Sequence, residues 1–67
     1  MSVAKVIEIS SSSTKSFQDA IERGLARVTK TMKHVQGAWI KEQKVELAKG
    51  KITAYRVNMS VTFVLED

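Results

Sequence analysis

The stretch "YRVNMSVTFVL", residues 55 to 65, alternates apolar and polar side chains with hardly a break. A strict period of two is typical of a β-strand that buries one of its faces. We expect this strand to run from residue 52 to residue 65. Its buried face would consist of Tyr55, Val57, Met59, Val61, Phe63 and Leu65. Its opposite face would be polar, with Arg56, Asn58, Ser60 and Thr62.

Upstream of this strand, between residue 17 and about residue 35, the period changes to that of a helix. Apolar residues or glycine recur at spacings of three and four, which places them on one stripe: Phe17, Ala20, Ile21, Gly24, Leu25, Val28, Met32 and Val35. Ser16, followed by Asp19, predicts the N-cap. Gly37 is expected to end the helix or to lie just past its end. Gly24 costs the helix about 1 kcal/mol in propensity, so we expect it to permit a close approach to the sheet.

The remaining segments predict two further strands. Residues 3 to 9 are rich in β-branched side chains, and a polar loop of residues 10 to 16 connects them to the helix. Residues 38 to 47 form the second predicted strand, and "AKGK" at 48 to 51 predicts a turn with a positive φ at Gly50. The order is β-α-β-β, which predicts an α+β fold with one helix on one face of a three-stranded antiparallel sheet.

Length and composition limit how the chain can be stabilised. The 67 residues are expected to form one domain, residues 1–67, and such short chains are marginally stable alone. The chain has no Cys and one His, which excludes disulfides and a typical zinc site, so association with further copies is the remaining remedy. The third strand, at about 3.3 Å per residue, would span roughly 45 Å. A helix of about 19 residues covers only about 28 Å of it.

Charge and hydropathy indicate where the protein works. The net charge of +4 is spread over the helix and the strands, which favours a solvated surface over a nucleic-acid patch. No segment has the roughly 20 apolar residues of a membrane span. The N-terminal segment is too short and too alternating for a signal peptide. We therefore expect a cytoplasmic protein with no membrane partner.

No arrangement of residues predicts catalysis, so we expect no enzyme and no catalytic residue. The single His34 follows Lys33 on the predicted helix, and the glycines are too far apart for a phosphate-binding loop. No carboxylate spacing matches a calcium loop, so no metal site is predicted. A sheet that binds RNA needs exposed aromatic rings, but Tyr55 and Phe63 belong to the buried set. Trp39 alone remains, which makes a nucleic-acid partner an unlikely alternative.

Several motifs, in order and without gaps, resemble those of the dodecins, a family of small flavin-binding proteins. They are "KVIEI" at 5–9, "SF" at 16–17, "AI...G.ARVTKT" ending at 31, "IKEQ" at 40–43, "GKI" at 50–52 and "YRVNMSVTFVLE" at 55–66. The resemblance implies a hollow homo-dodecamer with helices outside and sheets inside. It also implies flavins held in pairs between tryptophans of neighbouring subunits, for storage, sequestration or photoprotection rather than catalysis. Some members of the family also bind coenzyme A.

The two residues that mark the flavin site of the family are both changed in this chain. The resemblance places the stacking Trp at Gly37 and a hydrogen-bonding Gln at Arg56. Because residues 37 and 39 share a parity, Trp39 would offer a ring on the same face, displaced by about 6.6 Å. Arg56 favours a phosphorylated flavin (FMN) over riboflavin. The candidate flavin-binding residues are Gln36, Gly37, Trp39, Gln43 and Arg56.

Other interpretations of these residues remain open. Trp39 is equally suited to packing in a subunit interface, where Trp is enriched. For Arg56, an ion pair with Glu42 or Glu46 from a neighbouring strand or subunit is somewhat favoured over ligand binding. As a whole, the protein is either a flavin-binding dodecin with an altered site or a dodecin-like shell that has lost flavin and binds ions, coenzyme A or nothing.

Overall fold

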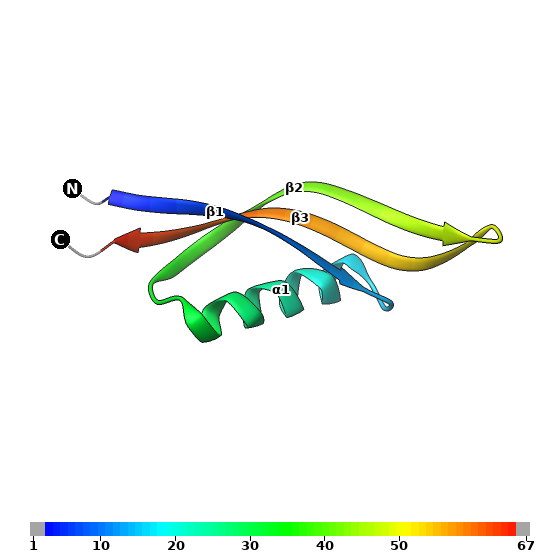
Figure 1. Cartoon of the computed structure of the whole chain (residues 1–67), viewed down its shortest axis with the longest axis horizontal. Helices are drawn as coiled ribbons and strands as arrows, with labels where there is room; N and C mark the ends of the chain where they lie inside the picture. The colour runs from blue at the N-terminus through cyan, green and yellow to red at the C-terminus, as the bar shows by residue number, and fades with distance from the viewer. Residues whose placement is uncertain (1–2, 66–67) are drawn as a thin grey trace.

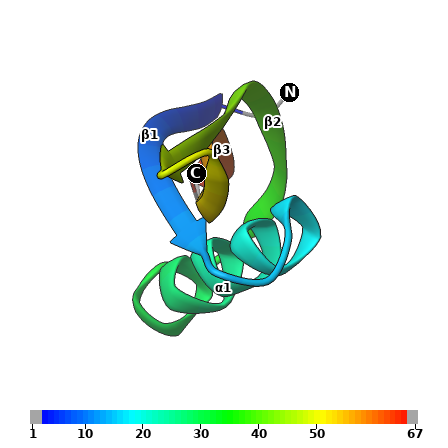
Figure 2. The same cartoon turned by 90° about the vertical axis from the view of Figure 1, so that its right-hand side faces the viewer.

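The structure is a computed structural model that describes residues 3–65. It contains β1 (Val3–Ser13), α1 (Phe17–Thr31), β2 (Val35–Ala48) and β3 (Lys51–Leu65). The strands form one antiparallel sheet in the order β1-β3-β2. The helix lies across one face of this sheet (Figures 1 and 2). The predicted β-α-β-β order and α+β class are confirmed.

The core lies between α1 and the central strand β3. Val57, Met59 and Val61 are fully buried, and Phe63 is nearly so. Ala20 and Val28 from the helix pack against this set. Full burial of a side chain of this size stabilises the fold by about 1.5–3 kcal/mol, so the alternating residues of β3 carry much of the stability. The predicted buried face of β3 is confirmed at these four residues, but the prediction is wrong at Leu65, which is 43% exposed at the end of the strand.

The helix begins where the sequence predicts but ends earlier. The Ser16 side chain accepts a hydrogen bond from the Asp19 backbone N–H, as an N-cap does. The helix then ends at Thr31 rather than near residue 35, and the positive φ that follows it belongs to His34. The prediction that Gly37 ends the helix is wrong, because Gly37 lies inside β2.

The apolar stripe overestimated the length of the helix. Val35 continues the stripe at helical spacing, but it packs on the core from a strand. Val35 is the first residue of β2 and pairs with Phe63 of β3. Near the end of the helix, the hydroxyls of Thr29 and Thr31 donate to the backbone carbonyls of Ala26 and Val28. Threonine competes for helical backbone groups in this way and is a poor helix former.

The outer strands are longer than predicted, and the serine run is not a loop. Ser10 to Ser13 complete β1 by pairing with residues 55 to 58 of β3. β2 likewise begins at Val35 rather than residue 38. Serine has modest strand propensity, but β3 is long enough to supply a partner backbone for each of these residues.

The β2–β3 hairpin closes through Lys49 and Gly50, which have φ angles of 53° and 77°. Two positive φ values are typical of a type I′ turn. Three residues are extra in the ladder between these strands: Gln36 and Lys41 on β2, and Thr53 on β3. Each such bulge shifts the register by one residue and re-aims the neighbouring side chains.

The hairpin projects well beyond the helix (Figure 1), and the molecule measures 52 × 20 × 13 Å. Near its tip Val45, Leu47 and Ile52 are exposed. Exposed apolar side chains grouped in this way are typical of a surface that a partner covers. Within residues 3–65, α1 is neither long nor apolar enough to cross a membrane.

Gly24 lies where the helix comes closest to the sheet. A Cβ at this position would be 2.7 Å from Met59 Cε and 3.0 Å from Ser11 Cβ. We expect Gly24→Ala to lower the free energy of unfolding by about 1 kcal/mol. Overpacking, at about 1–3 kcal/mol, outweighs the gain of about 1 kcal/mol in helix propensity. Urea denaturation at matched protein concentration measures the change.

A matched control for Gly24→Ala is Ala26→Gly, on the exposed side of the same helix. This variant is expected to lose about 1 kcal/mol through propensity alone. A rise in stability for Gly24→Ala would show that the helix does not press on the sheet at this point.

Asp19 connects the start of the helix to the end of β1. Its carboxylate accepts hydrogen bonds from the Ser13 hydroxyl and from Arg23 Nε. These contacts, that of Ser13 first, hold the pKa of Asp19 below its ordinary value. A lowered pKa contributes stability above the unfolded-state pKa of about 3.9 and loses it as the pH falls through the folded-state value.

We therefore expect Asp19→Asn to be less stable than the native protein at pH 7. The difference should shrink as the pH falls below about 4, because the native carboxylate is then protonated as well. Thermal melts at several pH values measure this. A difference that stays constant across the range would mean that the ionised form of Asp19 does not stabilise the fold.

Candidate functional site

The sheet face turned away from α1 carries the candidate site, and we call it the open face. Its central row comes from β3: Arg56, Asn58, Ser60 and Thr62. The register places Gly37 opposite Thr62 and Trp39 opposite Ser60. The part of the open face that β2 contributes here is accessible to solvent. Trp39 is 77% exposed, and a Cβ at Gly37 would meet no atom within 4 Å.

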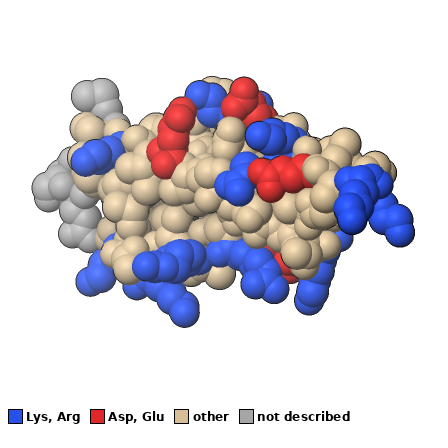
Figure 3. Space-filling model, turned by 45° about the vertical axis from the view of Figure 1, so that its right-hand side comes forward, with Lys and Arg blue, Asp and Glu red and all other residues tan. Residues whose placement is uncertain are grey.

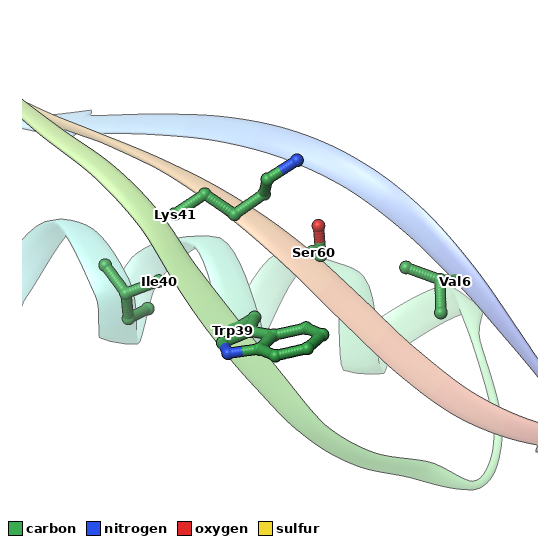
Figure 4. Close-up of a pocket in the computed structure, with 5 residues that line it drawn as sticks. All are labelled: Val6, Trp39, Ile40, Lys41 and Ser60. Atoms are coloured by element: carbon green, nitrogen blue, oxygen red, sulfur yellow. The ribbon is translucent and has the colours of Figure 1, made fainter.

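Trp39 forms one side of a shallow hollow on the open face. The hollow has a volume of about 460 Å³ and is lined by Val6, Trp39, Ile40, Lys41 and Ser60. Figure 4 shows Trp39 on β2 and Val6 on β1, with Ser60 on the strand between them. An exposed indole and a facing aliphatic side chain provide a surface on which a flat ring can stack.

A charged pair lies beside this hollow: Lys41 lines it, and Glu8 lines the adjoining hollow that Lys41 also borders. Lys41 Nζ lies 2.8 Å from Glu8 Oε2, so the pair spans the central strand from β2 to β1. The hydrogen bond from Lys41, followed by its charge, lowers the pKa of Glu8, and a hydrogen bond from Ser60 acts in the same direction. The same partner raises the pKa of Lys41. The amine that lines the hollow thus has a carboxylate directly beside it.

Lys41 is the extra residue of a bulge in β2 and keeps the parity of Trp39, so its side chain stays on the open face, where it reaches Glu8. Ile40 pairs with Met59 and Glu42 pairs with Asn58, which leaves Lys41 as the extra residue between them. Ile40 packs on the core, whereas Lys41 contacts Glu8 on the open face. Bulges are common next to binding sites.

Arg56 lies further along the open face and is already paired. Its Nε is 3.4 Å from Glu46 Oε2, and its Nη1 donates to Ser10 Oγ at 3.1 Å. The predicted ion pair between Arg56 and Glu46 is therefore present. Nearby, Asn58 donates to Glu42 at 2.9 Å. Figure 3 shows acidic and basic side chains side by side over the upper part of the surface, while Lys and Arg gather along its lower edge.

The structure brings together only some of the predicted site residues. Gly37 and Trp39 share the open face, as predicted from parity. Arg56 is on this face too, but four residues from Ser60, which is about 13 Å along β3. Gln43 pairs with buried Val57 and so belongs to the opposite face, and Gln36 is exposed at a bulge. The flavin-binding roles of these five residues stay predictions.

Sequence reasoning missed the other residues around the hollow. Val6 was detectable, since it breaks the apolar parity of the first strand and pairs with Thr62 of the polar face. Ser60 was assigned to the correct face but not to a site. Lys41 shares the parity of Trp39, and Glu8 shares that of Val6, so counting could have placed both on the open face.

The aromatic residues distribute over the two faces as predicted. Tyr55 packs edge-to-face on Phe17 of the helix, with ring centroids 5.2 Å apart. Phe63 is in the core. Because the chain has one Trp, one Tyr and two Phe, Trp39 is the aromatic residue that the open face presents.

Comparison with known proteins agrees with this architecture. Residues 3–66 match the family model described as Dodecin. The dodecin of Thermus thermophilus is 31% identical over 65 residues, which cover 97% of this chain and 94% of that protein. An Arg-to-Ala variant of the Thermus thermophilus dodecin matches with a TM-score of 0.93 at 30% identity, over 100% of both chains.

Two further solved structures extend the likeness. Dodecin from Streptomyces davaonensis has a TM-score of 0.92 at 26% identity, over 98% of this chain and 97% of its own. The calcium dodecin of Mycobacterium tuberculosis, described as calcium-chelating with a novel calcium-binding site, has a TM-score of 0.83 at 29% identity. That match covers 96% of this chain and 91% of the other.

A single helix across a strongly curved three-stranded sheet, with an aromatic ring on the open face, defines a class of very small α+β proteins. The family match over nearly the whole length makes the assignment within this class specific. The chain belongs to the dodecin family.

Proposed function

We propose that this protein binds flavin without catalysing a reaction, as a dodecin-type store or sequestering protein with an altered site. The observation that carries the proposal is Trp39, a single Trp left 77% exposed on the open face beside a hollow. A flavin ring stacked on Trp39 would also contact Val6 across Ser60.

The residues around the hollow suit a flavin in two ways. The indole and Val6 are apolar surfaces for a flat ring, and base–aromatic stacking contributes about 1–3 kcal/mol. Ser60 and Lys41 line the hollow as polar groups, and Glu8 lies beside Lys41. When bound, flavin supplies light absorption, and a stacked indole is an electron-rich neighbour that shortens its excited state. Photoprotection follows from this contact.

Arg56 does not reach the hollow and is held by Glu46 and Ser10. A preference for FMN over riboflavin would therefore need Arg56 of another copy, or a ligand tail that extends along β3. We keep both flavins as ligands and propose that the complete site forms between copies in a homo-dodecamer. The exposed apolar residues near the hairpin tip support association. A cytoplasmic location also stays a prediction.

The alternative function, a shell that binds ions or coenzyme A, has a calcium-binding relative in its favour. Among residues 3–65, no group of three or more His, Cys, Asp or Glu side chains lies close enough together to hold a metal ion. The geometry of the described residues therefore supports the flavin proposal better.

Fluorescence titration tests the proposed function. Because Trp39 is the single Trp, indole emission reports on this ring alone. We expect riboflavin or FMN to quench Trp39, and the protein to quench flavin emission with the same dissociation constant. A protein that stays colourless on purification and quenches neither signal would contradict the proposal.

A further inference from the structure

We infer that Glu8 and Lys41 recognise the polar edge of the bound ring, and that the hollow selects flat rings in which a carbonyl oxygen and a ring N–H are neighbours. The imide edge of a flavin has this pattern. The inference rests on the proposed function and specifies which part of the ligand is recognised.

The first step is the chemistry of the pair. A lysine ammonium has three N–H donors, and a carboxylate accepts at two oxygens. With Nζ and Oε2 only 2.8 Å apart, the pair presents a donor directly beside an acceptor. Neighbouring C=O and N–H groups on one ring edge would meet this pair in register, with the carbonyl toward Lys41 and the N–H toward Glu8.

The second step is position. Trp39 and Glu8 both pair with Ser60, from opposite sides of β3, so the three residues form one row across the sheet. Two strand spacings separate Trp39 from Glu8, about 10 Å between their backbones. This is the length scale of a fused tricyclic ring. A ring stacked on Trp39 and directed toward β1 therefore ends at the charged pair.

The third step is availability. The side chains of Lys41 and Glu8 are 51% and 68% exposed, so a ligand can reach both. Ser60 beneath them is buried, and the hydrogen bond from Lys41 orients the Glu8 carboxylate. As a purely structural contact, an exposed ion pair contributes little to stability. Its place beside the hollow, in the row of Trp39 and Ser60, suits a role in ligand recognition.

The experiment compares two ligands. Lumiflavin has the tricyclic ring without the ribityl chain and phosphate, and a second lumiflavin carries a methyl group on the imide nitrogen in place of the N–H. We expect methylation to weaken binding to the native protein about tenfold, because a hydrogen bond to a charged group is lost. Quenching of flavin emission gives both dissociation constants.

Variants of Glu8 connect this loss to one side chain. In Glu8→Met, which has no acceptor, the two ligands should bind within about twofold of each other. Glu8→Gln keeps an acceptor oxygen and should retain part of the discrimination. The control is Glu22→Gln, on the exposed surface of α1, which should discriminate as the native protein does.

Each outcome bears on the inference. One contrary result is that lumiflavin binds with quenching that depends on Trp39 while methylation does not weaken its binding. Another is that methylation weakens binding in Glu8→Met as much as in the native protein. Either result overturns the recognition role of Glu8 while the proposed function stands. If neither ligand binds the native protein, the proposed function and the inference both fail. Should Glu8→Met not fold, the native protein and Glu8→Gln still decide the question with the two ligands.

Discussion

Replacing Trp39 by alanine is expected to weaken flavin binding by one to two decades and to abolish most of the quenching of bound flavin. The stacking contact of about 1–3 kcal/mol per ring is lost, and 1.4 kcal/mol corresponds to a factor of ten. Because the ring is largely exposed, the variant should fold with nearly native stability. Titration of riboflavin and FMN, followed by flavin emission, measures the loss.

Two further variants make the Trp39 result specific. Trp39→Phe keeps a smaller ring and should fall between the native protein and Trp39→Ala. Val45→Ala removes an exposed apolar side chain near the hairpin tip, far from the hollow along β2, and should leave quenching unchanged if association is intact. Equal quenching by the native protein and Trp39→Ala would mean that flavin does not bind at this ring.

The substitution Gly37→Trp is expected to raise flavin affinity about tenfold or more. The resemblance to other dodecins implies an aromatic ring at this position, and the structure leaves room for one. A Cβ at Gly37 meets nothing within 4 Å, and the backbone there does not have a positive φ. Gly37 faces the same side of the sheet as Trp39, about 6.6 Å away along the strand.

The fold should tolerate Gly37→Trp, since aromatic residues have a higher strand propensity than glycine. Gly37→Leu is the control, because it adds apolar surface without an aromatic ring. Gly37→Trp combined with Trp39→Ala shows whether the new ring replaces the old one or adds to it. No gain in affinity from Gly37→Trp would indicate that the ligand does not reach this part of the open face.

The fold could be predicted because its main signals are local and redundant. The alternation in residues 55 to 65 alone identifies the buried face of β3, and four of its predicted members are in the core: Val57, Met59, Val61 and Phe63. Ser16 caps the helix as predicted, and Gly24 lies at the close approach of the helix to the sheet, also as predicted. The end of the helix was missed because Val35 satisfies the helical and the strand pattern at once.

The site was less predictable because it depends on irregular pairing. Parity alone places Trp39 and Gly37 on one face, but Gln43 lies beyond the extra residue Lys41, and its position cannot be derived by counting from Trp39. The pairing of Lys41 with Glu8 joins residues 33 positions apart in the sequence. No periodicity of a single strand carries such information.

The bulges at Gln36 and Lys41 limit the positions in β2 at which an aromatic ring can face the open side of the sheet. Between the two bulges, residues 37 to 40 alternate regularly between the two faces of the sheet, and their alternation is not continuous with that of the strand on either side. Moving the aromatic ring from Trp39 by one residue, to position 40, would point it toward Met59 and the core. A move of two residues, to position 37, keeps it on the open face. A ring can therefore change position on the open face of this segment only in steps of two residues, and Trp39 is one such step from Gly37.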